Sequence, residues 1–180
     1  MLGAQSQRIT VEGRFLKNPK FQHGKVSLSN GSVYEGDLKN FFFHGKGKQT
    51  WRMFGHISGS FLHGKIDGYA ELTSDYYLYK GEFKDNKRHG IGFMWIKNQG
   101  LYMGQWVNNW MHGYGVIKGT SGAEIGCQFE HGRFVKSQLQ SFSYDGVINE
   151  RILKRLKKKL SRFIREHDID KYYLFGSQQD

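Results

Sequence analysis

The sequence of 180 residues contains one cysteine, Cys127, and one proline, Pro19. A single cysteine excludes an internal disulfide framework and leaves no cysteine pair for a cysteine-rich zinc module. A reducing compartment is therefore expected. No apolar run reaches the 18 residues that a membrane-spanning helix requires. The first residues, MLGAQSQR, lack the apolar run of a signal peptide, so we expect a cytoplasmic protein.

Glycine and aromatic residues are abundant instead. The chain has 24 glycines, and aromatic residues make up 16% of it. Collagen-like and disordered chains rich in glycine contain far more proline, and disordered segments contain few aromatic residues. The glycines therefore punctuate a folded chain. The net charge of +11 is unevenly distributed, as described below.

A repeat organises most of the chain, and each copy begins with an aromatic or aliphatic residue followed two positions later by glycine and four later by an aromatic or leucine residue. The copies start at Val11, Tyr34, Ile57, Tyr79, Tyr102 and Ile125, and the fifth opens as Tyr-Met-Gly-Gln-Trp. The steps between starts are 23, 23, 22, 23 and 23 residues. In copy six Cys127 replaces the glycine, so this copy is a degenerate end, and packing against the core explains Cys127 better than nucleophilic catalysis.

A second signature, His-Gly-x-Gly, follows in the three clearest copies, beginning at His44, His89 and His112. Copy three has Asp67-Gly68-Tyr69-Ala70 instead, and copy one keeps only Gly24.

Each copy is predicted to form a β-hairpin. Alternate side chains of a strand share a face, so the tyrosine, glycine and aromatic residue of each opening point the same way. Glycine and asparagine tolerate positive φ, so we place the turn at the seventh position after each start, which holds Asn18, Gly64, Asn86, Asn109 and Gly132. Second strands follow at 92–97 and 115–118, and the His-Gly-x-Gly glycines lie between strands. We expect each glycine to leave room for the ring of the neighbouring copy.

The two signatures together resemble the MORN (membrane occupation and recognition nexus) repeat over about residues 11–136. The resemblance implies an all-β repeat solenoid, a single-layer elongated sheet of stacked hairpins, here with one C-terminal α-helix. A lone hairpin cannot bury its aromatic face, and stacking supplies the partner. The residues assigned to this structural role are Tyr34, Gly36, Gly45, Gly47, Gly59, Phe61, Tyr79, Gly81, Phe83, Gly90, Gly92, Tyr102, Gly104, Trp106, Gly113 and Gly115.

The predicted organisation has five parts. An N-terminal extension (1–10) precedes the repeat array (11–136), a linker (137–144), a basic amphipathic helix (145–168) and a C-terminal tail (169–180). The tail contains an apolar stretch, 172–175, whose packing site the sequence does not identify.

The sequence predicts no catalytic site, no cofactor and no metal site. Equivalent histidines on successive hairpins lie about 10 Å apart, whereas zinc ligands lie about 2 Å from one ion. The Gly-x-Gly pairs do not open a helix within a βαβ unit, as a dinucleotide-binding loop must. Acidic residues are scattered without a convergent pair. We therefore expect a protein without enzymatic activity.

Two departures from the repeat are candidate partner-binding surfaces. The turn of copy two is Phe41-Phe42-Phe43, and the same edge carries Trp110 and Met111 in copy five. Three phenylalanines suit a solvated turn poorly, because burial of each ring is worth about 1.5–3 kcal/mol. Phe93 and Trp95 lie in copy four, on a strand face that is otherwise polar. For each of these surfaces the alternatives are a partner and coverage by the chain's own terminal segments, in particular the C-terminal helix.

The C-terminal helix is the third departure. Apolar residues from Ile148 to Ile164 recur at helical spacing. Residues 147–167 contain two glutamates and eight cations, a net charge of +6: Arg151, Lys154, Arg155, Lys157, Lys158, Lys159, Arg162 and Arg165. The apolar stripe could cap the end of the sheet, but capping does not explain the charge. A basic amphipathic helix suits an anionic membrane or an acidic protein, and nucleic acid is disfavoured because the repeats carry no matching basic stripe.

These observations predict an interaction scaffold that binds protein partners in a multi-subunit complex. Members of the family that the repeats resemble recur in axonemes, notably radial spokes, and at membrane junctions, which implies a cytoskeletal or ciliary assembly. Two alternatives remain open: a peripheral membrane module acting through the basic helix, and a regulatory subunit of an enzyme on another chain.

Overall fold

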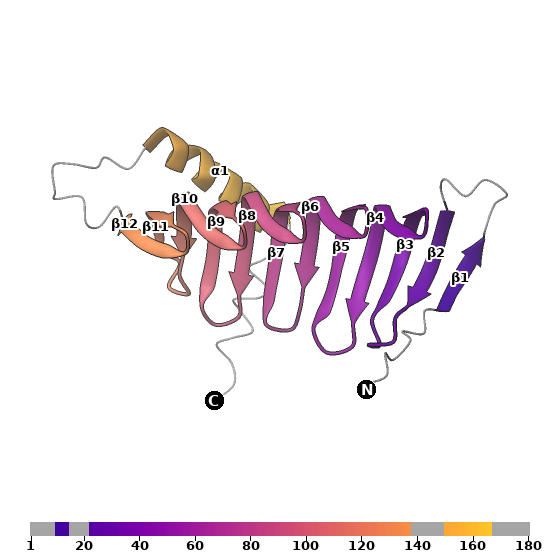
Figure 1. Ribbon diagram of the computed structural model, residues 1–180. Helices are drawn as coiled ribbons and strands as arrows, with labels where there is room; N and C mark the ends of the chain where they lie inside the picture. Colours follow the sequence, from indigo (N-terminus) through magenta and orange to yellow (C-terminus); the bar gives the residue numbers. More distant parts are fainter. Residues whose placement is uncertain (1–9, 15–21, 138–149, 167–180) are drawn as a thin grey trace, which may run out of the picture. The chain divides into compact units, whose positions relative to one another are not determined.

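The computed structural model describes residues 10–14, 22–137 and 150–166. The chain forms two compact units, and Figure 1 labels their strands and the helix. The first contains residues up to Asp75 together with Phe83–Asn86, and the second contains Tyr76–Glu82 and the chain from Lys87 onward. In both units consecutive strands pair antiparallel in chain order.

The strands of the first unit are β1 (Thr10–Arg14), β2 (Gln22–Ser27), β3 (Val33–Lys39), β4 (Phe42–Trp51), β5 (Gly55–Leu62) and β6 (Lys65–Thr73). The second unit has β7 (Tyr77–Lys84, whose last residues belong to the first unit), β8 (Lys87–Ile96), β9 (Gly100–Val107), β10 (Trp110–Lys118), β11 (Glu124–Glu130), β12 (Arg133–Ser137) and the helix α1 (Glu150–Glu166). The predicted fold class, stacked antiparallel hairpins followed by one helix, is confirmed.

The predicted turns lie where glycine or asparagine was expected. Gly64, Asn86, Asn109 and Gly132 all have positive φ, between 66° and 81°. Asn18 lies outside the described residues. Neighbouring hairpin tips are linked by backbone hydrogen bonds, because the N–H of this turn residue donates to a carbonyl of the preceding copy. Gly64 N–H donates to Phe43 O (2.9 Å), and Asn109 N–H donates to Arg88 O (3.0 Å).

The second strands are longer than predicted, and the prediction that the His-Gly-x-Gly glycines lie between strands is wrong. Gly45 and Gly47 lie inside β4, and the first of them has a φ of 58°. Such a residue forms a β-bulge, and the β3–β4 register shifts between Gly36 and Leu38. A side chain of the first strand accepts the bulge N–H, as Asp37 Oδ2 does from Lys46 N–H at 2.9 Å. Glu82 and Gln105 do the same for Ile91 and Tyr114.

The glycines make room for the tyrosine of their own copy, not for a ring of the neighbouring copy as expected. The Tyr79 ring lies over Gly81 and Gly92, and a Cβ on Gly92 would fall inside the volume of the ring. Tyr34 and Tyr102 lie over their own glycine pairs in the same way. The tyrosine hydroxyl reaches past the glycines and donates to a carbonyl of the same strand, Glu82 O at 3.1 Å. Tyr34 and Tyr79 are fully buried.

Aromatic rings from neighbouring copies complete this core. The Trp106 ring meets the Tyr79 and Tyr102 rings edge to face, each at 5.4 Å between centroids. The Arg88 guanidinium lies 4.6 Å from the Trp106 centroid, a cation–π contact. Burial lowers the pKa of this arginine.

Copy three shows the same constraint with different residues. Its first residue is Ile57, whose side chain does not reach as far as a tyrosine ring, and the position opposite Gly59 holds Ala70 instead of glycine. Ala70 is buried at 1% exposure. The alanine methyl group therefore occupies space that a tyrosine ring fills in copies two, four and five.

This constraint predicts a coupled pair of substitutions. Gly92→Ala should lower the free energy of unfolding by about 1–3 kcal/mol, because the new methyl group overpacks the Tyr79 ring. The same substitution should cost clearly less in a Tyr79→Ile background, which reproduces the residues of copy three. Urea unfolding of the two single variants and the double variant measures the coupling. Equal costs in both backgrounds would show that the ring does not require the glycine.

Candidate interaction surfaces

The three phenylalanines at the tip of β3 and β4 divide into a half-buried residue and two exposed ones. The Phe43 ring stacks on Tyr34, with centroids 3.8 Å apart, and meets Phe61 edge to face at 6.1 Å. Phe43 is therefore half-buried and packs against two residues of the hydrophobic core. The Phe41 and Phe42 side chains are 70% and 57% exposed. No described residue covers this pair, so a partner-binding role stays a prediction for these two and loses support for Phe43.

Phe41 occupies the turn position at which the other described copies have glycine or asparagine. Its φ is 64°, inside the left-handed region. A bulky residue in this region is a conformational outlier, and such backbone strain costs on the order of 1–3 kcal/mol. This strained conformation does not bury the side chain, because most of the ring faces solvent. Folding therefore does not explain this phenylalanine.

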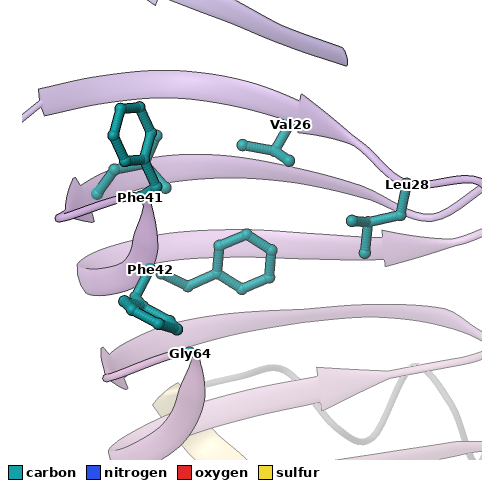
Figure 2. A pocket seen from close by; sticks show the side chains of 7 residues that line it. Val26, Leu28, Phe41, Phe42 and Gly64 are labelled. Atoms are coloured by element: carbon teal, nitrogen blue, oxygen red, sulfur yellow. The ribbon is translucent and has the colours of Figure 1, made fainter. Parts of the chain in front are cut away.

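The two exposed rings border an open apolar cavity of about 520 Å³ in the first unit. Figure 2 shows Phe42 beside Gly64 of the next tip and Val26 and Leu28 on the other side of the cavity. Leu38 and Phe43 complete the lining. All of the lining side chains are apolar, so the cavity has no side-chain polar group to hold a small polar ligand. We name Phe41, Phe42 and this lining the phenylalanine groove.

Trp110 has the same position in copy five as Phe42 in copy two. Its side chain is 58% exposed, and its ring lies against Gly132 of the next tip. In copies three and four the equivalent residues are Lys65 and Lys87, and the next tip has asparagine. The glycine of the next tip thus makes room for an aromatic ring here. Met111 is partly buried, and a partner-binding role for Trp110 and Met111 stays a prediction.

Phe93 and Trp95 were proposed as partner-binding residues, and the structure requires a correction. Their side chains are 1% and 8% exposed, because α1 covers this face of β8, β9 and β10 (Figure 1). The Phe163 ring of α1 stacks on Phe93 at 3.9 Å between centroids. The alternative, docking of the chain's own helix, is what the structure shows.

The helix covers the face of the sheet and not its terminal edge. Leu153, Leu156 and Leu160 lie at 1%, 4% and 0% exposure against Leu101, Met103 and Val116 of the strands, with Phe163 and Ile164 completing the helix side. The equivalents of Phe93 in copies two and three, Lys48 and Glu71, are charged, whereas Val116 of copy five is apolar, so copies four and five present an apolar face to the helix. α1 lies within the predicted range 145–168.

The cations of α1 lie mostly on its solvent-exposed side. Seven are exposed and Lys157 is partly buried. Among the described residues, Arg162 alone of these has a carboxylate partner, and its Nε lies 2.7 Å from Glu166 Oε1. The apolar side chains of the helix pack against the sheet. The side chains that the helix exposes to solvent are therefore mainly charged.

Two features escaped the sequence analysis. Met53 and Phe54, at the turn between β4 and β5, are 84% and 74% exposed. The criterion that identified Phe41, an apolar residue in a turn, also identifies these two. The histidines also pair across tips: His44 with His63 at 5.6 Å between rings, and His112 with His131 at 4.9 Å. Each pair joins two different repeat positions of neighbouring copies, so a comparison of equivalent positions does not reveal it. No described group of three His, Cys, Asp or Glu is placed to hold a metal ion.

Cys127 is fully buried, and its Sγ lies 3.4 Å from the carbonyl oxygen of Gly115. Burial raises the pKa of this thiol to about 12. The thiolate, which is the nucleophilic form, is therefore disfavoured at neutral pH. This environment fits the packing role that the sequence indicated.

Comparison with known proteins supports the assignment of the repeats. Residues 34–55, 58–75, 79–100 and 102–124 match the family model described as MORN repeat. Alsin of Rattus norvegicus is 28% identical over 121 residues, and alsin of Homo sapiens is 27% identical over the same length. Each match covers 60% of this chain but only 7% of the relative's length. The likeness to alsin thus concerns a small part of that protein.

The strain at Phe41 predicts that its removal stabilises the fold. Phe41→Asn should raise the free energy of unfolding by about 1 kcal/mol, because asparagine tolerates positive φ. Phe42→Asn is the matched control, since Phe42 has no positive φ and its ring contacts Gly64. Urea unfolding compares the two variants. A loss of stability in Phe41→Asn would mean that the exposed ring supports the fold after all.

The docking of α1 predicts a large effect of one buried leucine. Leu160→Ala should lower the free energy of unfolding of the second unit by about 2–5 kcal/mol, because it leaves a cavity between helix and sheet. The neighbouring exposed substitution Lys159→Ala should change it by less than about 0.5 kcal/mol. Chemical denaturation followed by tryptophan emission measures both. Similar values for the two variants would contradict the docked position of the helix.

Proposed function

The chain belongs to the MORN repeat family, and on this premise we propose that it is a non-catalytic scaffold that holds protein partners in a larger cytoskeletal or ciliary assembly. Repeats of this family are generally non-catalytic interaction or membrane-associated modules. The observation that carries the proposal is Phe41. A strained, exposed aromatic residue stands where the fold favours asparagine or glycine, beside an apolar groove.

A protein partner explains this arrangement better than the fold does. Exposed aromatic residues at the rim of an apolar groove are typical of the residues that dominate protein interfaces. Binding would bury the two rings and the lining of the groove, and apolar burial contributes about 25 cal/mol per Å².

Membrane attachment through α1 is the alternative. No helix among the described residues is long and apolar enough to cross a bilayer. The apolar stripe of α1 is packed on the sheet, so the docked helix cannot insert it between lipids. Its cations would still contribute surface attraction of about 1 kcal/mol each near an anionic leaflet. The third possibility, a regulatory subunit of an enzyme on another chain, would use the same phenylalanine groove.

Localisation in ciliated cells tests the proposal. The tagged full chain should concentrate at a cytoskeletal or ciliary structure, and a Phe41→Asn/Phe42→Asn variant should become diffuse while its thermal stability is retained. The matched control is Phe54→Asn, which removes an equally exposed ring at the opposite end of a hairpin. A diffuse wild-type protein would contradict the cytoskeletal role, and a variant distributed like the wild type would remove the groove from it.

A further inference from the structure

The outward face of α1 carries an ordered line of cations. Arg151, Arg155, Lys158, Arg162 and Arg165 follow one another at steps of 4, 3, 4 and 3 residues. At 100° per residue they lie within about 40° of a single line along the helix, and the line is about 21 Å long. Leu160, fully buried against the sheet, points about 180° away from Arg151. We name these five residues the arginine stripe.

Arginine is concentrated on one line of this helix, together with a single lysine, Lys158. All four arginines of α1 lie in the stripe, whereas Lys154, Lys157 and Lys159 lie on its flanks. A diffuse anionic surface would attract the two residue types alike. Arginine differs in presenting a planar fork of N–H donors that matches a carboxylate or phosphate at a fixed position. The concentration of arginine on this line therefore indicates a partner with anions in a fixed geometry.

The stripe does not serve the stability of the helix. Like charges at positions i and i+4, such as Arg151 with Arg155 and Lys158 with Arg162, repel each other and destabilise a helix. Within α1 the only acidic residues are Glu150 and Glu166, at its two ends. Glu166 accepts a hydrogen bond from Arg162 at 2.7 Å, so one arginine of the stripe already has a carboxylate partner within α1.

The spacing of the stripe identifies the shape of the partner. Steps of 4 and 3 form the line along which one helix contacts a second helix at a small crossing angle. A nucleic-acid strand would instead require aromatic residues between the cations for base stacking, and the exposed face of α1 has none. We propose that the arginine stripe binds an acidic helix of a protein partner, with Glu or Asp side chains at steps of 4, 3, 4 and 3.

This second surface lies on the second unit and does not depend on the phenylalanine groove. The two proposals can fail separately, because the experiment below measures binding to α1 in vitro and the localisation experiment alters only the first unit.

The test uses two synthetic alanine-based helical peptides with five glutamates each. One has them at steps of 4, 3, 4 and 3, and the other has the same composition with the glutamates distributed around the helix. Fluorescence anisotropy with the full chain should show at least ~10-fold tighter binding of the first peptide. Glu166→Gln frees Arg162 and should tighten that binding about twofold.

Two variants of the chain separate geometry from charge. Replacing the four arginines by lysine keeps the net charge and should abolish the preference between the peptides. Replacing Lys154, Lys157 and Lys159 by glutamine removes three charges and should preserve it. Circular dichroism and the thermal midpoint confirm that both variants are folded.

The opposite pattern overturns the proposal. Equal binding of both peptides by the wild type, or a preference that survives the arginine-to-lysine exchange, would show that only net charge matters. Binding to vesicles with 30 mol% phosphatidylserine is the comparison arm. Vesicle binding that persists after arginine-to-lysine exchange and falls after lysine-to-glutamine exchange, without any peptide preference, would assign the helix to an anionic membrane instead.

Discussion

In copies two, four and five the ring of a tyrosine lies flat over two glycines that face each other on paired strands, and the rest of the hairpin depends on this contact. The ring fills the space that two missing side chains leave, and its hydroxyl donates to a carbonyl further along the same strand, as Tyr102 does to Gln105 at 3.1 Å. The next copy then supplies the edge-on ring that closes the layer, such as Phe129 on Tyr102. A glycine pair without its tyrosine would leave a hole, and a tyrosine without the glycines would have no room.

The regular residues of the copies therefore explain folding, and each irregular position needs an explanation of its own. Phe41 departs from the rule for the turn, and its exposed ring has no structural reason in the described part of the chain. Phe93 and Trp95 depart from the polar face, but their reason is internal, because α1 packs on them. The same kind of sequence irregularity thus marks an exposed surface at Phe41 and a surface covered by α1 at Phe93 and Trp95.

The sequence allowed the repeat, the turns and the helix to be predicted, because each depends on residues close together in the chain. The 23-residue spacing and the turn residues such as Asn86 and Asn109 are local signals. The features that could not be predicted depend on contacts between segments far apart in the chain. The bulge at Gly45 requires a side chain on the opposite strand, Asp37, to accept the freed N–H. The choice between helix and partner for Phe93 depended on Phe163, 70 residues later, and periodicity alone does not say which face a helix will cover.

The docked helix also changes how the second unit responds to local opening. In an array of hairpins each copy contacts only its neighbours, so unfolding can begin at an end and proceed copy by copy. α1 contacts strands of two copies at once, through Phe93 on β8 and Val116 on β10. Neither copy can open without releasing the buried face of the helix, so these strands behave as one cooperative block. No described helix packs across the hairpins that carry the phenylalanine groove. The two sides of the groove can therefore adjust to the shape of a bound partner.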